Sequence, residues 1–323
     1  MPDSEKRLIQ HIRRLAPVGP TVVRGIGDDC AVIRIPRGHE ALITTDFSLE
    51  GIHFRRPLHP ADSVGHRCLA RGLSDIAAMG GDPRAAFLSL AAPRTLPQSW
   101  INRFLAGLLG LAKAFAVPLA GGDIAECSAG VLADIAVFGS VPRGRAILRQ
   151  GAKAGDAIYV TGRLGGSAAV LDKLGSRSKR RFCRGDHVHF YPTPRVSIGR
   201  YLREHRLATS MIDISDGLST DLGHICDESQ VGAVITAAQI PVAQLGNERR
   251  RVDLSFALYG GEDYELLFTS RQGQRVPARI LGVPITRVGE VVRPRGMRLI
   301  LSGGRMRQLW PKGWQHFSPG VGR

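Results

Sequence analysis

The residues of this chain that could do chemistry are aspartates that follow glycines or strand-like runs. In GIGDDC, residues 25–30, two carboxylates lie side by side between glycines. The other acids recur in short motifs: Asp46 in ITTD, Asp75 in LSD, Asp123 in AGGD, Asp213 and Asp216 in DISDG, and Glu262 with Asp263 in GGEDYE. Loops at such places present side chains to a ligand from a rigid scaffold. Any single one of these acids could equally be a turn residue or a helix cap, so the interpretation rests on their number.

Repulsion between these acids indicates what they would bind. If they converge in space, their mutual repulsion requires cations. Oxygen ligands without clustered Cys or His favour Mg²⁺ over zinc or iron. Since Mg²⁺ usually takes one or two carboxylates and completes its shell with water and phosphate oxygens, the acids predict several Mg²⁺ ions and a polyphosphate substrate.

The familiar phosphate-binding motifs are missing from the sequence. No lysine is followed by Ser or Thr, as a P-loop requires. GIGDDC also fails the dinucleotide pattern G-x-G-x-x-G, because Cys30 stands in the place of the third glycine. Metal ions, arginines and main-chain amides would have to hold the phosphates. The amides could come from AGGD or from GRLGGSAA, residues 162–169, although both could be plain turns.

The elements that must position these acids are mixed strands and helices. Runs rich in β-branched residues predict strands at 39–47, 130–141, 156–162, 232–240, 264–269 and 297–304. Helical spacing of apolar residues predicts helices at 63–79, 98–116, 194–204 and 218–228. A cluster of Pro, Gly and Arg at 140–157 marks a boundary. We therefore expect an α/β protein of two domains, residues 1–148 and 149–323.

Composition limits the classes of partner. The 323 residues include 44 Lys+Arg and 28 Asp+Glu, a net charge of +16. Such a charge is compatible with nucleic-acid binding, anionic substrates or an arginine-rich proteome. The cations are spread over both halves rather than gathered in one stripe, so we expect no nucleic-acid partner. Five separated cysteines and the lack of an apolar run near the ~20 residues of a membrane helix predict a cytoplasmic protein with no membrane partner.

In this order the motifs resemble those of the thiamine-monophosphate kinase family. Its superfamily includes aminoimidazole ribonucleotide synthetase, selenophosphate synthetase and a hydrogenase maturation factor. The matching segments, which span residues 25–317, are GIGDDCAVI, ITTDFSLEGIHF, LSDIAAMGGDPR, AGGD, GRAILRQGAKAGD, MIDISDGLSTDLGHI, YGGEDYELLFT and KGWQHF. The resemblance implies ATP-dependent phosphorylation of thiamine monophosphate to thiamine diphosphate, with Mg²⁺ and direct transfer between the substrates.

The resemblance also implies a fold and an assembly. It implies an α/β fold of the α+β type, with an N-terminal mixed sheet and helices that bind ATP and Mg²⁺ and pair in a homodimer. The C-terminal domain would be an α/β sandwich, and the metal-nucleotide site would lie near the cleft between the domains.

Matching motif positions assign roles to individual residues. The metal ligands are expected to be Asp29, Thr44, Thr45, Asp46, Asp75, Asp123, Asp213 and Asp216, and Asp46, Asp75, Asp123 and Asp213 are expected to be catalytic. ATP contacts are expected from Gly122, Asp123, Arg149 and Ser215, and contacts to the acceptor substrate from His53, Glu262 and Trp314. Asp28 would mainly hold its turn. Trp314 could stack on the cationic thiazolium or the pyrimidine, or could simply pack the tail onto the core.

The chemistry inferred from the residues agrees with this assignment. The attacking group would be an oxygen of a phosphate monoester, whose second pKa near ~6 leaves it largely ionised at neutral pH. No general base is then needed. Catalysis would rest on positioning two polyanions and neutralising their charge, as in other phosphoryl transfers.

Three departures from the family pattern lie near the expected phosphate site. The family usually has Asn at Gly72, Asp at Gly166 and Thr-Thr-Arg at residues 124–126, where this chain has Ile-Ala-Glu. All the expected metal carboxylates remain. We therefore expect an altered rate or nucleotide affinity rather than lost chemistry.

Other enzymes of the superfamily are the nearest alternatives. A selenophosphate synthetase should have a reactive Cys or selenocysteine with a nearby Lys, and Cys30 has no such lysine. A hydrogenase maturation protein should end in a modifiable Cys, whereas this sequence ends SPGVGR. An aminoimidazole ribonucleotide synthetase stays open, although EGIHF and GGEDYELLFT favour the thiamine enzyme. A basic nucleic-acid-binding protein with purely structural acids is a more distant alternative.

Overall fold

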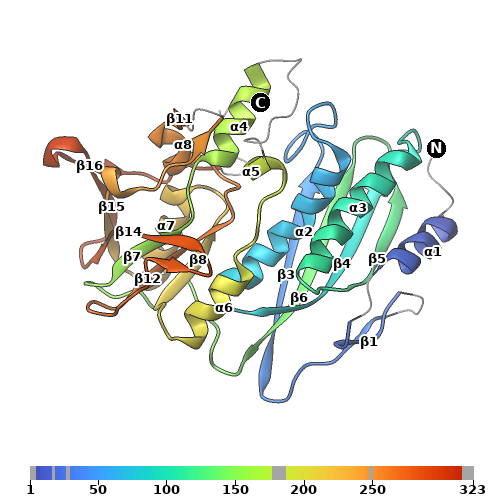
Figure 1. Ribbon diagram of the computed structural model, residues 1–323, viewed down its shortest axis with the longest axis horizontal. Coiled ribbons are helices and arrows are strands. Elements are labelled where there is room, and N and C mark those ends of the chain that lie inside the picture. The colour runs from blue at the N-terminus through green and yellow to red at the C-terminus, as the bar shows by residue number, and fades with distance from the viewer. Residues whose placement is uncertain (1–4, 17–18, 27–29, 177–186, 247–249, 315–323) are drawn as a thin grey trace. The chain divides into compact units, whose positions relative to one another are not determined.

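The computed structural model describes residues 5–16, 19–26, 30–176, 187–246 and 250–314 (Figure 1). The chain divides into two compact units. Unit 1 consists of Met1–Ile76 and Gly81–Ala146, and unit 2 of Ala77–Gly80 and Ile147–Arg323. The sequence places one boundary near residue 148 and does not predict that Ala77–Gly80 group with unit 2. In unit 2, Arg203 Nη1 donates to Gly80 O at 2.6 Å.

Unit 1 is built on a four-stranded mixed sheet in the order β3-β6-β4-β5. Its strands are β3 (His39–Leu49), β4 (Asp82–Ala92), β5 (Leu119–Glu126) and β6 (Leu132–Pro142). Only the β4/β5 pair is parallel among these neighbours. The helices α2 (Ala61–Ala78) and α3 (Gln98–Ala114) run alongside the sheet in Figure 1. The unit also contains α1 (Glu5–Leu15) and the short pair β1 (Val22–Arg24) and β2 (Val32–Ile33).

Strand β3 shows which face of this sheet is covered. Leu42 and Ser48 are buried, whereas Ile43 and Phe47 are 72% and 53% exposed. Because successive side chains of a strand point to opposite faces, one face of β3 meets the core and the other presents apolar groups to solvent. The predicted mixed α/β sheet of the N-terminal half is confirmed.

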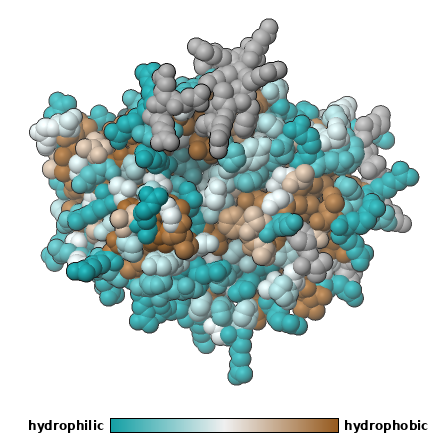
Figure 2. All heavy atoms as spheres, in the orientation of Figure 1, coloured by the Kyte–Doolittle hydropathy of each residue, from teal (hydrophilic) through white to brown (hydrophobic). Residues whose placement is uncertain are grey.

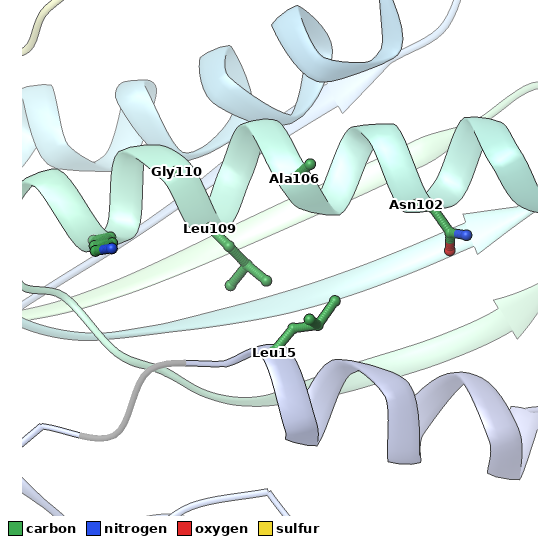
Figure 3. A pocket seen from close by; sticks show the side chains of 6 residues that line it. Leu15, Asn102, Ala106, Leu109 and Gly110 are labelled. Atoms are coloured by element: carbon green, nitrogen blue, oxygen red, sulfur yellow. The ribbon is translucent and has the colours of Figure 1, made fainter.

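Helices α2 and α3 approach each other closely at two glycines. A Cβ added to Gly65 would lie 1.9 Å from Phe104 O, and one added to Gly107 would lie 1.8 Å from Asp62 O. Both distances are far below van der Waals contact, so any side chain here must separate the helices. In contrast, Gly110 on α3 borders a hollow of about 320 Å³ between α1 and α3, and its Cβ would meet nothing within 4 Å (Figure 3).

We predict opposite effects of two alanine substitutions on α3. Gly107→Ala should lower the free energy of unfolding by roughly 1–3 kcal/mol, because the helices must move apart. Gly110→Ala, its control, should raise stability by about 0.5–1 kcal/mol, since alanine favours the helix and the methyl has room. Urea unfolding followed by circular dichroism measures both. Equal effects of the two substitutions would contradict the close helix contact.

Unit 2 is built on an eight-stranded sheet in the order β16-β15-β9-β14-β7-β12-β8, with β13 beside β14. The strands are β7 (Ala157–Thr161), β8 (Ser210–Ile214), β9 (Gly232–Thr236), β12 (Glu265–Ser270), β13 (Arg279–Ile280), β14 (Val283–Val292), β15 (Gly296–Ile300) and β16 (Met306–Leu309). The helices are α4 (Gly166–Ser176), α5 (His187–Phe190), α6 (Val196–Glu204), α7 (Leu218–Ser229) and α8 (Leu254–Tyr259). A small pair, β10 (Gln244–Leu245) and β11 (Arg250–Arg251), completes the unit.

Helix α7 is fixed to this sheet by its apolar side. Leu218, Leu222 and Ile225 are fully buried in one cluster with Ile212 of β8 and Ile235 of β9. The spacing of four and three residues places the three α7 side chains on one helix face. The start of α7 is thereby held next to the end of β8, where Asp213 lies. The expected α/β construction of the C-terminal half is confirmed.

Several expected elements differ in the structure. The strand expected over 232–240 ends at Thr236 and continues as the 3₁₀ turn η2 (Ala237–Gln239), and the one expected over 297–304 ends at Ile300 before η3 (Ser302–Gly304). AGGD, considered as a glycine turn, lies within strand β5. Strands β4 and β14 are absent from the sequence prediction.

The surface and the helices are consistent with the charged composition. The face drawn in Figure 2 is mostly hydrophilic, with apolar areas between polar side chains. None of the helices that the structure describes combines the length and the apolar character that crossing a membrane requires.

Candidate active site

In unit 1, strand β3 and helix α2 bring three of the expected metal ligands together. Thr44 Oγ1 donates a hydrogen bond to Asp75 Oδ2 across the strand-helix contact. Arg71, one turn before Asp75 on α2, lies with Nη1 3.8 Å from Asp46 Oδ1. Thr44 and Asp46 are two residues apart and therefore share the face of β3 toward α2. Thr45 points to the opposite, exposed face.

Arg71 is also tied to the main chain of β3. Its Nη1 donates to Phe47 O at 3.1 Å, and its side chain is 9% exposed. A buried cation beside Asp46 stabilises the ionised form of that carboxylate. The side-chain oxygen atoms of Thr44, Asp46 and Asp75 are the kind of metal ligand that Mg²⁺ prefers.

Gly122 and Asp123 lie at the other edge of the same sheet. In register, Asp46 of β3 pairs with Ile135 of β6, which pairs with Leu88 of β4, which pairs with Gly122 of β5. Three inter-strand steps separate the outer strands by about 14 Å along the sheet. Within unit 1 the structure therefore does not bring Asp123 beside Asp46.

The close approach of strand β4 explains why residue 122 is a glycine. Its φ is 147°, and an added Cβ would lie 1.8 Å from Leu88 O. Only glycine fits such an approach of β4 to β5.

His53 lies in the tight turn that follows β3. Its Nδ1 accepts a hydrogen bond from Leu49 N at 3.0 Å, and its own amide donates to Leu49 O at 2.9 Å. With Nδ1 accepting, the neutral ring carries its proton on Nε2. The turn thus sets both the position and the tautomer of this expected substrate contact.

In unit 2, the end of β8 and the turn after it carry three of the expected site residues. Asp213 is buried within β8, and Ser215 and Asp216 follow it before Gly217, whose φ is 106°. The loop before β12 packs against this turn: Glu262 N donates to Ser215 O at 2.7 Å and Tyr264 N donates to Ile214 O at 3.0 Å.

The loop residue Glu262 has an unusual backbone. Its φ is +65°, in the left-handed region that non-glycine residues seldom adopt. Such conformations cluster at functional sites, where the surrounding structure enforces them. Here the enforcing contact is the hydrogen bond to Ser215 O.

The C-terminal segment joins the same place. Trp314 N donates to Asp216 O at 3.1 Å, and the Trp314 side chain is 45% exposed. The structure therefore brings together a second set of expected residues: Asp213, Ser215, Asp216, Glu262 and Trp314.

Two residues of α7 were missed by the sequence analysis. The ligand atoms of Asp216, Asp221 and His224 all lie within 4.8 Å of one another. Asp221 is 1% exposed, and its Oδ2 accepts from Asp216 N at 3.2 Å. Burial raises the pKa of Asp221 well above its ordinary value, and the charges of Asp213 and Asp216 raise it further. The only signal in the sequence was an acid in the first helical turn after DISDG, which is equally typical of an ordinary helix start.

The carboxylate of Asp263 binds amides of the glycine loop GRLGGSAA, which the sequence suggests as a phosphate-binding loop. Its Oδ2 accepts from Gly165 N at 2.6 Å and its Oδ1 from Ser167 N at 3.3 Å, at the start of α4. Burial of this carboxylate raises its pKa to about 7, and the amide hydrogen bonds oppose that rise. The amides of GRLGG are therefore used by the protein itself.

We predict that the raised pKa of Asp263 makes the folded protein more stable at acid pH than at neutral pH. In the folded protein the pKa of Asp263 is about 7, whereas the pKa of the free side chain is 3.8. Stability of the wild type should therefore fall as the pH rises between these values, relative to Asp263→Asn, which does not titrate there. Urea unfolding of both proteins at about pH 5 and about pH 8 measures the difference. A wild type that gains relative stability at the higher pH would show that the amides outweigh burial.

Comparisons with known proteins identify the family of this chain. Residues 27–141 match the family model "AIR synthase related protein, N-terminal domain", and residues 153–302 match its C-terminal domain. The chain is 39% identical to thiamine-monophosphate kinase of Escherichia coli (strain K12) over 305 residues, 91% of this chain and 92% of that protein. It is 32% identical to thiamine-monophosphate kinase of Bacillus subtilis (strain 168) over 303 residues, 91% of this chain and 93% of that protein.

The chain belongs to the thiamine-monophosphate kinase family. Solved structures of this family share its fold. The thiamine-monophosphate kinase from Stenotrophomonas maltophilia K279a superposes with a TM-score of 0.81 at 32% identity, covering 94% of this chain and 98% of that one. AaThiL complexed with AMPPCP and TMP gives a TM-score of 0.76 at 29% identity and covers 97% of each chain.

Two further positions expected of the thiamine-monophosphate kinase family remain to be placed. Arg149 is exposed, and its carbonyl accepts a hydrogen bond from Ser229 Oγ at 3.1 Å. Asp29 lies outside the described residues, as does Asp28.

The departure from the family at Gly72 has a packing counterpart. A Cβ at this position of α2 would lie 2.5 Å from Val137 Cγ2 on β6. An asparagine would require Val137 to move.

Proposed function

We propose that this protein transfers the γ-phosphoryl group of ATP to thiamine monophosphate, forming thiamine diphosphate. The observation that carries the proposal is that the chain is 39% identical to thiamine-monophosphate kinase of Escherichia coli (strain K12) and shares the fold of AaThiL, which was solved with AMPPCP and TMP. The other enzymes of the superfamily are disfavoured, because the relatives that are 39% and 32% identical to this chain are thiamine-monophosphate kinases.

The ions of this reaction are Mg²⁺, held by two sets of oxygen ligands. Thr44, Asp46 and Asp75 form one set, and Asp213 with Asp216 the core of the other. We assign Asp29, Thr45 and Asp123 to the same role by motif. Bound Mg²⁺ supplies charge neutralisation and orientation of the phosphate oxygens. Asp46, Asp75, Asp123 and Asp213 are the residues most directly required for turnover.

The protein's own groups bind and orient the two substrates. Gly122, Asp123, Arg149 and Ser215 contact ATP, and Arg149 offers a planar, two-pronged donor suited to phosphate. His53, Glu262 and Trp314 bind thiamine monophosphate: the indole faces a cationic thiazolium, and His53 Nε2–H is a donor. The acceptor phosphate is largely ionised at neutral pH, so the protein needs no base to activate it.

The direct test is an assay with ATP, Mg²⁺ and thiamine monophosphate. Thiamine diphosphate should form in step with ADP, as measured by chromatography. No thiamine diphosphate, together with turnover of formylglycinamidine ribonucleotide or of selenide, would show that the protein is another enzyme of the superfamily.

We predict that Asp46→Asn and Asp75→Asn each lower kcat by at least about a hundredfold, because a lost carboxylate removes charge stabilisation that acts in the transition state. Asn is nearly isosteric, so thermal midpoints should stay close to that of the wild type. Asp172→Asn, on the exposed side of α4, serves as the control and should keep full activity. Wild-type kcat in either site variant would contradict the metal assignment.

We further propose that residues 1–148 form the ATP- and Mg²⁺-binding domain that pairs in a homodimer, with residues 149–323 as the second domain. Strand β3 is an edge strand of its sheet, and its Ile43 and Phe47 are exposed on the face away from α2. An apolar strand face at a sheet edge is a site for association unless it is covered. A second copy of the chain covers it.

We expect the double variant Ile43→Lys, Phe47→Lys to be monomeric, because paired lysines repel across a self-complementary interface. Sedimentation velocity measures the association state. Leu281→Lys, which changes another exposed apolar residue in unit 2, is the matched control and should stay dimeric. A dimeric double variant, or a monomeric wild type, would refute pairing through β3.

A further inference from the structure

The C-terminal segment 311–314 lies along one side of α7, toward the start of the helix. Pro311 Cγ lies 3.5 Å from the position of a Cβ on Gly223, and Lys312 N lies 3.4 Å from Ser219 Oγ. Gly313 N then donates to Thr220 Oγ1 at 3.0 Å. The segment ends with Trp314 N on Asp216 O. Successive residues of the segment therefore follow α7 back to the turn that carries Asp216.

Gly313 is the point where this segment comes closest to the turn. An added Cβ would lie 1.8 Å from Asp216 O and 2.6 Å from Thr220 Oγ1. Both neighbours belong to well-packed structure: Thr220 is 4% exposed, and the adjacent Leu218 and Leu222 are fully buried. The segment thus has no room to approach differently while Gly313 keeps its bond to Thr220.

The last two hydrogen bonds of the segment are donated by main-chain amides, those of Gly313 and Trp314. Trp314 is 45% exposed although its amide is bonded to Asp216 O. The main-chain hydrogen bond limits how far the Trp314 ring can move from the turn that carries Asp216.

We infer that Thr220 is a positioning residue for the acceptor substrate: its hydroxyl fixes Gly313, and through it holds Trp314 beside Asp216. The inference rests on the proposed function, because it takes thiamine monophosphate as the ligand of Trp314. Thr220 does not touch the substrate. Its effect is to remove conformational freedom from the residue that does, so that less ordering is needed on binding.

The test replaces the hydroxyl without changing the shape of the side chain. Thr220→Val keeps the branched side chain and removes the acceptor of the Gly313 amide. Loss of one such buried hydrogen bond should raise the population of the released segment about five- to tenfold. Gly313→Ala, which changes only the tail, should release the segment without touching the core of α7. Thr286→Val, the same substitution in a strand of unit 2 where valine is favoured, is the matched control.

Two measurements separate anchoring from binding. A lysine-specific protease, with release of the 313–323 peptide measured by mass spectrometry, reports how often the Lys312–Gly313 bond is exposed. Steady-state kinetics report the KM for thiamine monophosphate and for ATP separately. We expect both tail variants to be cleaved about five- to tenfold faster and to show a similar rise in the KM for thiamine monophosphate, with the KM for ATP unchanged within about twofold. Thr286→Val should match the wild type in every measurement.

The outcomes distinguish the inference from the proposed function. Wild-type cleavage rates in both tail variants would overturn the anchoring role of Thr220, whatever the enzyme does. Faster cleavage with an unchanged KM for thiamine monophosphate would overturn its role in substrate positioning. A wild type that makes no thiamine diphosphate overturns the proposed function and the substrate role together, and the protease measurement then still decides the anchoring. If Thr220→Val does not fold, Thr220→Ala, which also removes the hydroxyl, takes its place in both measurements.

Discussion

Repulsion between neighbouring carboxylates is the constraint on which the rest of the structure depends. Asp213, Asp216 and Asp221 are held around one turn, and burial with mutual repulsion raises the pKa of Asp221. Such a group of charges is unfavourable in a folded protein unless cations or hydrogen-bond donors compensate it. The amide of Asp216 and the start of α7 provide part of the compensation, and the Mg²⁺ ions of the proposed reaction would provide the rest. In unit 1 the guanidinium of Arg71 plays the same part beside Asp46.

Glycines at contacts let main chains approach where a side chain would keep them apart. Gly122 lets β4 and β5 meet, Gly313 brings the tail onto Asp216, and Gly65 and Gly107 let α2 and α3 touch. In each case the neighbour within 2 Å of an added Cβ is a main-chain carbonyl oxygen, which cannot turn away as a side chain can. The positions of the site residues therefore depend on the glycines at these close contacts. Close main-chain contacts at glycines thus hold the site residues in place in a glycine-rich sequence.

The sequence could predict the parts of the site that depend on local pattern. Strand spacing over 39–47 and helical spacing over 63–79 supply the two elements that bring Thr44, Asp46 and Asp75 together, and the motif order indicated the family. It could not predict contacts between distant segments. Asp263 caps the loop at Gly165, 98 residues away, and Thr220 binds Gly313, 93 residues away. Nothing near GRLGGSAA shows that its amides are already used, and nothing near Thr220 shows that its hydroxyl accepts from the tail.

The proposed function requires the dispersed acids to hold metal ions for one reaction. The most direct measurement is the number of Mn²⁺ ions bound per chain, counted by electron paramagnetic resonance in the presence of a non-hydrolysable ATP analogue, because Mn²⁺ accepts the oxygen ligands of Mg²⁺. The wild type should bind more ions than Asp75→Asn and more than Asp216→Asn, each of which removes a ligand from a different unit. Equal numbers of bound ions in all three proteins would contradict the claim.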